Sequence, residues 1–145
     1  MKKILFYSNA ILLLTSIHHI YGAILYQTPD RLHILYMSIP VLGFNAYMHY
    51  SADEKRSIKI IHAILTILFP LLLIGVFEGI YNHALKNILF FIGAPKEVMM
   101  QMFPPPVYVM PNDFWFEFTG VLQAILVLPA LYYCYRHYLG MKQQL

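Results

Sequence analysis

The stretch IKIIHAILTILFPLLLIGVFEGI, residues 58–80, decides the fold of this chain. It is apolar almost throughout, and its length matches the roughly 20 residues that a helix needs to cross about 30 Å of hydrocarbon. Three further segments have the same character, at residues 4–26, 32–50 and 114–138. The sequence therefore predicts four membrane-spanning helices.

The connections between these segments indicate how the helices are arranged. Residues 27–31 and 51–57 are short polar turns, and short turns join antiparallel neighbours. Residues 94–112 are predicted to be the longest irregular segment. They contain three consecutive prolines, Pro104 to Pro106, which favour a polyproline II stretch and exclude a helix there. We predict an all-α membrane protein in which four transmembrane helices form one antiparallel up-down bundle over residues 1–145, with an outer loop between the third and fourth spans.

The composition supports a membrane protein and excludes several other classes. Of the 145 residues, 59% are hydrophobic and 12% are charged, about half the charged share of a soluble domain. The net charge of +3 is dispersed and makes no basic face, so nucleic acid is not an expected partner. Lys2 and Lys3 before an apolar run imitate a signal peptide. The run continues to Tyr26 without a cleavage motif, so we interpret it as a retained span.

Lysine and arginine predict the orientation of the bundle. Seven of the ten lysine and arginine residues lie on the side of the two termini and three on the opposite side. Positive residues favour the cytoplasmic side of a membrane. Both termini are therefore predicted to be cytoplasmic. The seven are Lys2, Lys3, Lys55, Arg56, Lys59, Arg136 and Lys142, and the three are Arg31, Lys86 and Lys96.

The third span continues beyond Ile80 as a mostly apolar segment. A single helix from Ile58 to Ile92 would be about 50 Å long, which exceeds the bilayer core. We expect this helix either to project from the membrane or to bend along the interface. Gly75 and Gly79, four residues apart, present a small face suited to close helix packing.

Ionisable residues from all four predicted spans fall at a similar depth in the outer half of the bundle. Such groups are costly in lipid and usually face the interior of a bundle or a functional cavity. The candidate metal ligands are His18, His19, His33, Glu78 and Glu117. Imidazole and carboxylate suit zinc, iron or copper, and facing helices of a bundle are a known place for such sites.

The same residues could perform acid–base chemistry without a metal, with Glu78, Glu117 and His19 as the catalytic groups. Alternatively, the histidines could only hold helices together through hydrogen bonds. Adjacent residues point about 100° apart on a helix, so we expect only one of His18 and His19 to face the interior, and we favour His19. His83 lies near the predicted interface, where a polar side chain needs no special role.

Two weaker patterns complete the candidates. His49, His62 and His137 cluster toward the other side of the membrane, where they could ligate a haem but are more simply solvated. Met99, Met100, Met102 and Met110 gather in the outer loop, where thioethers could bind copper(I) or pack at the membrane surface.

The leading functional hypothesis is a His/Glu site in one half of the bundle that binds a metal or performs acid–base chemistry on a small or lipophilic substrate. A non-catalytic accessory subunit of a larger membrane complex and a small transporter are the alternatives. The lipid bilayer is the predicted partner, and a membrane-protein partner or a homo-oligomer fits the apolar surfaces of the spans.

Overall fold

The computed structural model describes residues 2–50, 55–105 and 108–142, and this part of the chain is helical without strands. The predicted charged turn at 51–57 lies largely outside these residues. The elements follow in the order α1 (Lys2–Leu25), η1 (Pro29–Ile34), α2 (Leu35–Tyr50), α3 (Arg56–Thr66), η2 (Ile67–Leu85), α4 (Lys86–Phe91), α5 (Lys96–Met102) and α6 (Phe114–Lys142). Here η1 is a 3-10 helix and η2 a π-helix.

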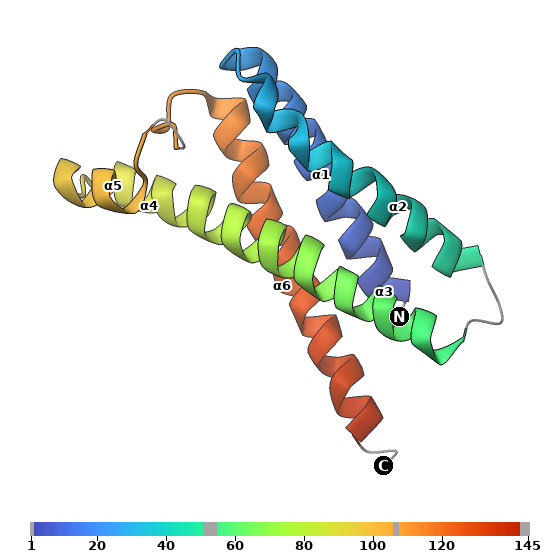
Figure 1. The fold of residues 1–145 in the computed structure, drawn as a ribbon. Coiled ribbons are helices and arrows are strands. Elements are labelled where there is room, and N and C mark those ends of the chain that lie inside the picture. Colours follow the sequence, from blue (N-terminus) through green and yellow to red (C-terminus); the bar gives the residue numbers. More distant parts are fainter. Residues whose placement is uncertain (1, 51–54, 106–107, 143–145) are drawn as a thin grey trace.

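The segments α3, η2 and α4 form one continuous helix of 36 residues, Arg56–Phe91, which runs across the molecule in Figure 1. The apolar stretch beyond Ile80 therefore continues the same helix. Pro70 interrupts ordinary helical bonding because it has no N–H to donate. The π-type pattern of η2 spans this position, so its hydrogen bonds join residues five apart instead of four.

Three helices are long and apolar enough to cross a membrane, which indicates a membrane protein: Lys2–Leu25, Arg56–Phe91 and Phe114–His137. The remaining predicted span, residues 32–50, which is the second in chain order, divides into η1 and the 16-residue α2. Helix α2 alone extends about 24 Å, less than the hydrocarbon core of a bilayer. The four-span bundle and the cytoplasmic placement of both termini therefore remain predictions.

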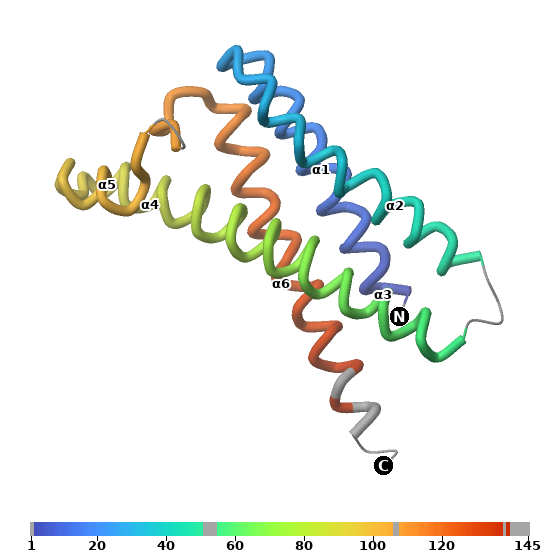
Figure 2. The backbone as a smooth tube through the Cα atoms, viewed as in Figure 1, coloured from blue at the N-terminus to red at the C-terminus, as the bar shows by residue number. Residues whose placement is uncertain are grey.

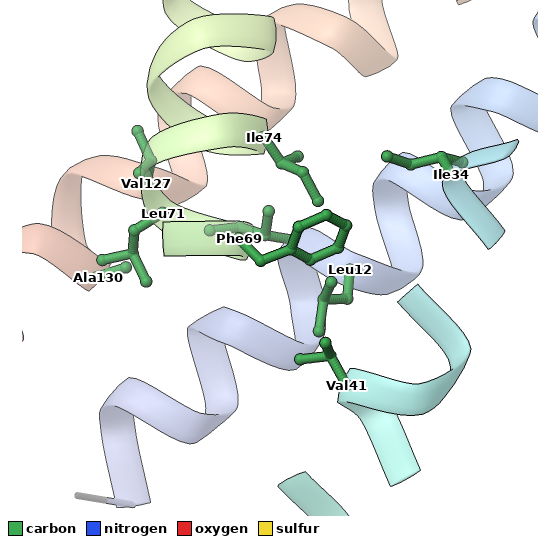
Figure 3. Packing of buried hydrophobic residues seen from close by; sticks show 9 residues of the cluster. Leu12, Ile34, Val41, Phe69, Leu71, Ile74, Val127 and Ala130 are labelled. Atoms are coloured by element: carbon green, nitrogen blue, oxygen red, sulfur yellow. The ribbon is translucent and has the colours of Figure 1, made fainter. Parts of the chain in front are cut away.

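The core lies where α1, α2, η2 and α6 meet, and Figure 3 shows its apolar side chains gathered between these helices. The pair Gly75 and Gly79 packs against α6. A Cβ atom at Gly79 would come within 2.6 Å of the backbone nitrogen of Ala124, and one at Gly75 would overlap Val127. The predicted small-residue face is thus confirmed as the contact of η2 with α6, which cross closely in Figure 2.

The end of α1 is fastened to the start of α6. Tyr26 donates a hydrogen bond to Oδ1 of Asn112 at 2.6 Å, and Tyr21 donates one to Oδ1 of Asp113 at 3.2 Å. The same Asp113 oxygen accepts the backbone N–H of Phe116, so Asp113 caps α6. We call this region, where α1 ends and α6 begins, the site end of the molecule.

The prediction that residues 94–112 are irregular throughout was wrong for residues 96–102. They form α5, which follows Pro95 and contains lysine, glutamate, methionine and glutamine, all good helix formers. Its end is held by Phe103, which is 0% exposed, and by Tyr81, whose hydroxyl donates to the carbonyl of Met102 at 2.9 Å. Pro104 and Pro105 then stay outside any helix, because consecutive prolines lack the N–H groups that helical hydrogen bonds need.

Candidate functional site

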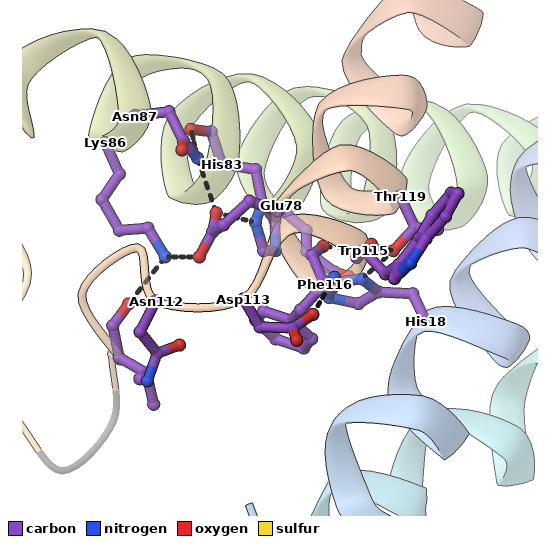
Figure 4. A network of polar contacts seen from close by, with 12 residues as sticks. His18, Glu78, His83, Lys86, Asn87, Asn112, Asp113, Trp115, Phe116 and Thr119 are labelled. Atoms are coloured by element: carbon purple, nitrogen blue, oxygen red, sulfur yellow. Dashed lines mark hydrogen bonds and ion pairs between the residues drawn. The ribbon is translucent and has the colours of Figure 1, made fainter. Parts of the chain in front are cut away.

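Three ionisable side chains meet inside the site end: His18 from α1, with Glu78 and His83 from η2 (Figure 4). One potential ligand atom of each lies within 4.8 Å of the others. His18 and His83 are 2% and 4% exposed, and the Glu78 side chain is 14% exposed. Groups of this kind stay buried only when partners satisfy them, so the partners define what the cluster can do.

The ring of His18 is oriented by α6. Its Nδ1 lies 2.9 Å from Oγ1 of Thr119, and that hydroxyl already donates to the backbone carbonyl of Trp115 at 2.8 Å. The Thr119 oxygen therefore accepts from His18, which places the ring proton on Nδ1. Phe116 stacks on the ring at 4.2 Å between centroids. The remaining nitrogen, Nε2, keeps its lone pair and lies 4.0 Å from Oε1 of Glu78.

His83 is oriented in the same way by a carboxylate. Its Nδ1 donates to Oε2 of Glu117 at 3.0 Å, and its ring meets that of His18 edge-on, 4.7 Å between centroids. This bond leaves Nε2 of His83 as its basic nitrogen. The ring fits against α6 only because residue 120 is glycine, since a Cβ atom there would overlap the imidazole.

His19 also contacts Glu78, so the expectation that only one of the adjacent histidines faces the interior was wrong. His19 donates Nδ1–H to the backbone carbonyl of Arg31 at 2.9 Å, and its Nε2 lies 3.1 Å from Oε1 of Glu78. The two rings diverge along α1, but Glu78 lies between them and reaches both. A nitrogen and a carboxylate oxygen this close need a proton between them, so His19 and Glu78 share one.

The partners of Glu78 leave one of its oxygens available. Thr15 donates to Oε1 at 3.2 Å, and His19 contacts the same atom. Within the described part of the chain, Oε2 forms no hydrogen bond. The cluster therefore offers a carboxylate oxygen and the Nε2 atoms of His18 and His83.

Glu117, a predicted ligand, lies behind His83 instead of beside Glu78. Its Oε1 accepts from Nζ of Lys86 at 3.0 Å, and Asn87 donates to its Oε2. Lys86, 2% exposed, also donates to the carbonyl of Val109 at 2.8 Å and so ties the outer loop to α4 and, through Glu117, to α6. Both carboxylate oxygens of Glu117 are thus engaged, and Glu117 supports His83.

His33, the remaining predicted ligand, is exposed at the edge of the site. Its Nδ1 donates to the carbonyl of Asp30 at 2.6 Å, and its ring centroid lies 6.0 Å from that of His19. His33 belongs to the wall of a pocket of about 600 Å³ that reaches the cluster from outside. Asn82 and Tyr108 also line this pocket. Burial raises the pKa of Tyr108, so its hydroxyl stays neutral.

The two weaker patterns separate in the structure. His62 is buried and bonds Oδ1 of Asn45 at 2.9 Å, whereas His49 and His137 are exposed. Met99 is buried and Met100 exposed, so their thioethers face different sides of α5. Neither set converges as the His18 cluster does.

Sequence reasoning missed His83, Lys86 and Thr119. On an α-helix, residues five apart point about 140° away from each other, so Glu78 and His83 would not share a face. The π-type bonding of η2 brings residues five apart onto nearly the same face of the helix. Glu78 and His83 therefore both reach the cluster.

The chain was compared with protein-family models, curated proteins and solved structures, and none of them matches it.

Proposed function

We propose that this protein is a membrane metalloprotein that binds one transition-metal ion, zinc or iron(II), through His18, His83 and Glu78. Two imidazoles and one carboxylate are the ligand set of many catalytic zinc sites and of non-haem iron sites, which keep further coordination positions open. The open position would face the 600 Å³ pocket, where a small or lipophilic substrate would bind. The ion would supply Lewis-acid chemistry there.

The observation that carries the proposal is the hydrogen-bond acceptor of the protein beside Nδ1 of each ring. His18 and His83 both give their Nδ1–H to an acceptor of the protein, Thr119 and Glu117. Both therefore present a basic Nε2 to the cluster, as metal-binding histidines do when a second partner sets their tautomer.

The ligand atoms have room to close around an ion. Ligands about 2.1 Å from a tetrahedral metal are about 3.4 Å apart, whereas one ligand atom from each of His18, Glu78 and His83 lies within 4.8 Å of the other two. Side-chain movements of roughly 1 Å are needed, and the pocket beside the cluster leaves space for them. Oε2 of Glu78 can approach the metal while Oε1 keeps its contacts with Thr15 and His19.

His19 is placed to move a proton beside the metal. It shares a proton with Glu78 and lines the same pocket, so it can act as general acid or base toward a bound substrate. This contact also supports the second candidate, acid–base chemistry by His19 and Glu78 without a metal. An accessory-subunit role predicts instead that the protein co-purifies with a partner in mild detergent.

Metal analysis of the full-length protein, purified in mild detergent, tests the proposal. The wild type should hold about one zinc or iron ion per chain, and His18→Ala, His83→Ala and Glu78→Gln should each lower this at least about tenfold. His49→Ala is the matched control, because His49 is exposed on α2 and should leave the metal content unchanged. The metal site would be rejected if the wild type still holds no metal after reconstitution with zinc or iron(II). It would also be rejected if all variants hold as much metal as the wild type.

A further inference from the structure

The pocket beside the cluster has one polar wall and one apolar wall. The polar wall comes from the turn between α1 and α2 and includes Thr28, Arg31 and His33. The apolar wall is formed by Ile34 with Leu73 and Phe77 of η2. A pocket with this division fits a ligand that is itself polar at one end and apolar at the other.

Arg31 is held in the polar wall as a preoriented cation. Its guanidinium lies over the rings of Tyr26 and Phe116, 5.2 and 5.3 Å from their centroids. Its Nε donates to Oγ1 of Thr28 at 2.8 Å, which fixes the plane of the group. Among the described residues Arg31 forms no ion pair, whereas Lys86 of α4, which also lines the pocket, is paired with Glu117.

Arg31 is also linked directly to the cluster. Its carbonyl accepts the Nδ1–H of His19, and the Phe116 ring under its guanidinium is the ring that stacks on His18. An anion bound by Arg31 would therefore lie next to the proposed metal. Guanidinium is suited to this role because it can bind a carboxylate or phosphate through two parallel hydrogen bonds.

The apolar wall continues onto the outer surface of the long helix. Leu73 and Phe77 are both 47% exposed and lie four residues apart in η2, inside the span Arg56–Phe91. In a membrane their exposed faces meet lipid chains. An apolar chain could thus lie along Leu73 and Phe77 while the group at its end remains in the pocket.

We propose that the site binds an acidic amphiphile, an apolar chain that ends in a carboxylate or a phosphate monoester. The anionic group binds Arg31 beside the metal, and the chain lies along Leu73 and Phe77 toward the bilayer. This inference rests on the proposed function, because it names the class of ligand for the same site.

Ligand binding by calorimetry, on full-length protein in nanodiscs of uncharged phosphatidylcholine, tests the inference. The probes are dodecanoate and dodecyl phosphate, with dodecanol as the uncharged control and acetate and inorganic phosphate as chainless controls. The two amphiphiles should bind wild type, and Arg31→Gln should weaken both at least about tenfold through loss of a charge-assisted pair. Arg136→Gln is the matched control, because Arg136 is exposed on α6 outside this pocket.

The apolar wall is tested by chain length. Binding to wild type should strengthen from hexanoate to dodecanoate, and Leu73→Ser with Phe77→Ser should remove most of that gain. Equal binding of dodecanol and dodecanoate, or wild-type affinity in Arg31→Gln, would overturn the inference. Chainless anions that bind as tightly as the amphiphiles would show a site for soluble anions instead.

Metal content measured in the same samples separates this inference from the proposed function. Arg31→Gln should keep its metal while losing the amphiphile. A wild type that holds metal but binds neither amphiphile would overturn only the inference. Amphiphile binding that depends on Arg31 in a protein without metal would overturn the metal site and leave the anion site standing.

Discussion

Lys86 is the buried cation on which the support of His83 depends. It is 2% exposed and bonds both Glu117 and the carbonyl of Val109. Lys86→Met should lower the free energy of unfolding by about 3–5 kcal/mol, because it leaves a buried carboxylate without its cation. Chemical unfolding in detergent measures this effect. Lys96→Met, at an exposed position, should stay near wild type, as should any surface substitution.

The double variant Lys86→Met with Glu117→Gln distinguishes loss of the pair from loss of packing. It removes both charges, so it should be more stable than Lys86→Met alone. The loss of unfolding free energy in the double variant is compared with the losses in Lys86→Met and Glu117→Gln. If it equals the sum of those two losses, the ion pair between Lys86 and Glu117 is contradicted.

Gly120 sets the position of His83. Gly120→Ala should push the imidazole out of place, lower metal affinity at least about tenfold and destabilise the fold by about 1–3 kcal/mol. Metal titration and unfolding measure the two effects. Gly43→Ala is the matched control, since a Cβ atom there meets nothing within 4 Å. Similar behaviour of the two variants would show that His83 does not depend on this close contact.

Helix α5 is held in place by Phe103, the residue that follows it. Phe103 is 0% exposed and packs 5.1 Å from the Tyr81 ring, between centroids. Phe103→Ala should cost about 3–5 kcal/mol and expose the amides of α5 to exchange. Hydrogen exchange combined with chemical unfolding measures both. Phe91→Ala serves as control because Phe91 is 75% exposed, and equal protection of α5 in the two variants would refute the anchoring role.

The topology of the whole chain depends on whether α2 takes part in crossing the bilayer. If η1 and α2 together cross the bilayer, the chain has four spans and its termini lie on the same side; with three spans they lie on opposite sides. The excess of lysine and arginine predicts that both are cytoplasmic. Protease accessibility of tags at each terminus, in intact and in opened cells, measures this. If the tag at one terminus is cleaved in intact cells and the tag at the other only in opened cells, the termini lie on opposite sides. That result would contradict the four-span prediction.

The sequence was sufficient to predict the helical class and three of the four proposed apolar spans. Length and hydrophobicity are local properties, and a backbone in lipid must satisfy its own hydrogen bonds, so residues such as those at 58–80 predict a helix without further information. The same reasoning placed His18, His19 and Glu78 at one level, where the structure brings them together.

Which of these residues meet depends on the tertiary structure. The π-type bonding of η2 turned His83 onto the face of Glu78, and glycine at position 120 let α6 approach its ring. Lys86 crosses to Glu117, which then supports His83 instead of joining Glu78. These outcomes depend on side-chain direction and on contacts between distant helices, and no local pattern in the sequence carries that information.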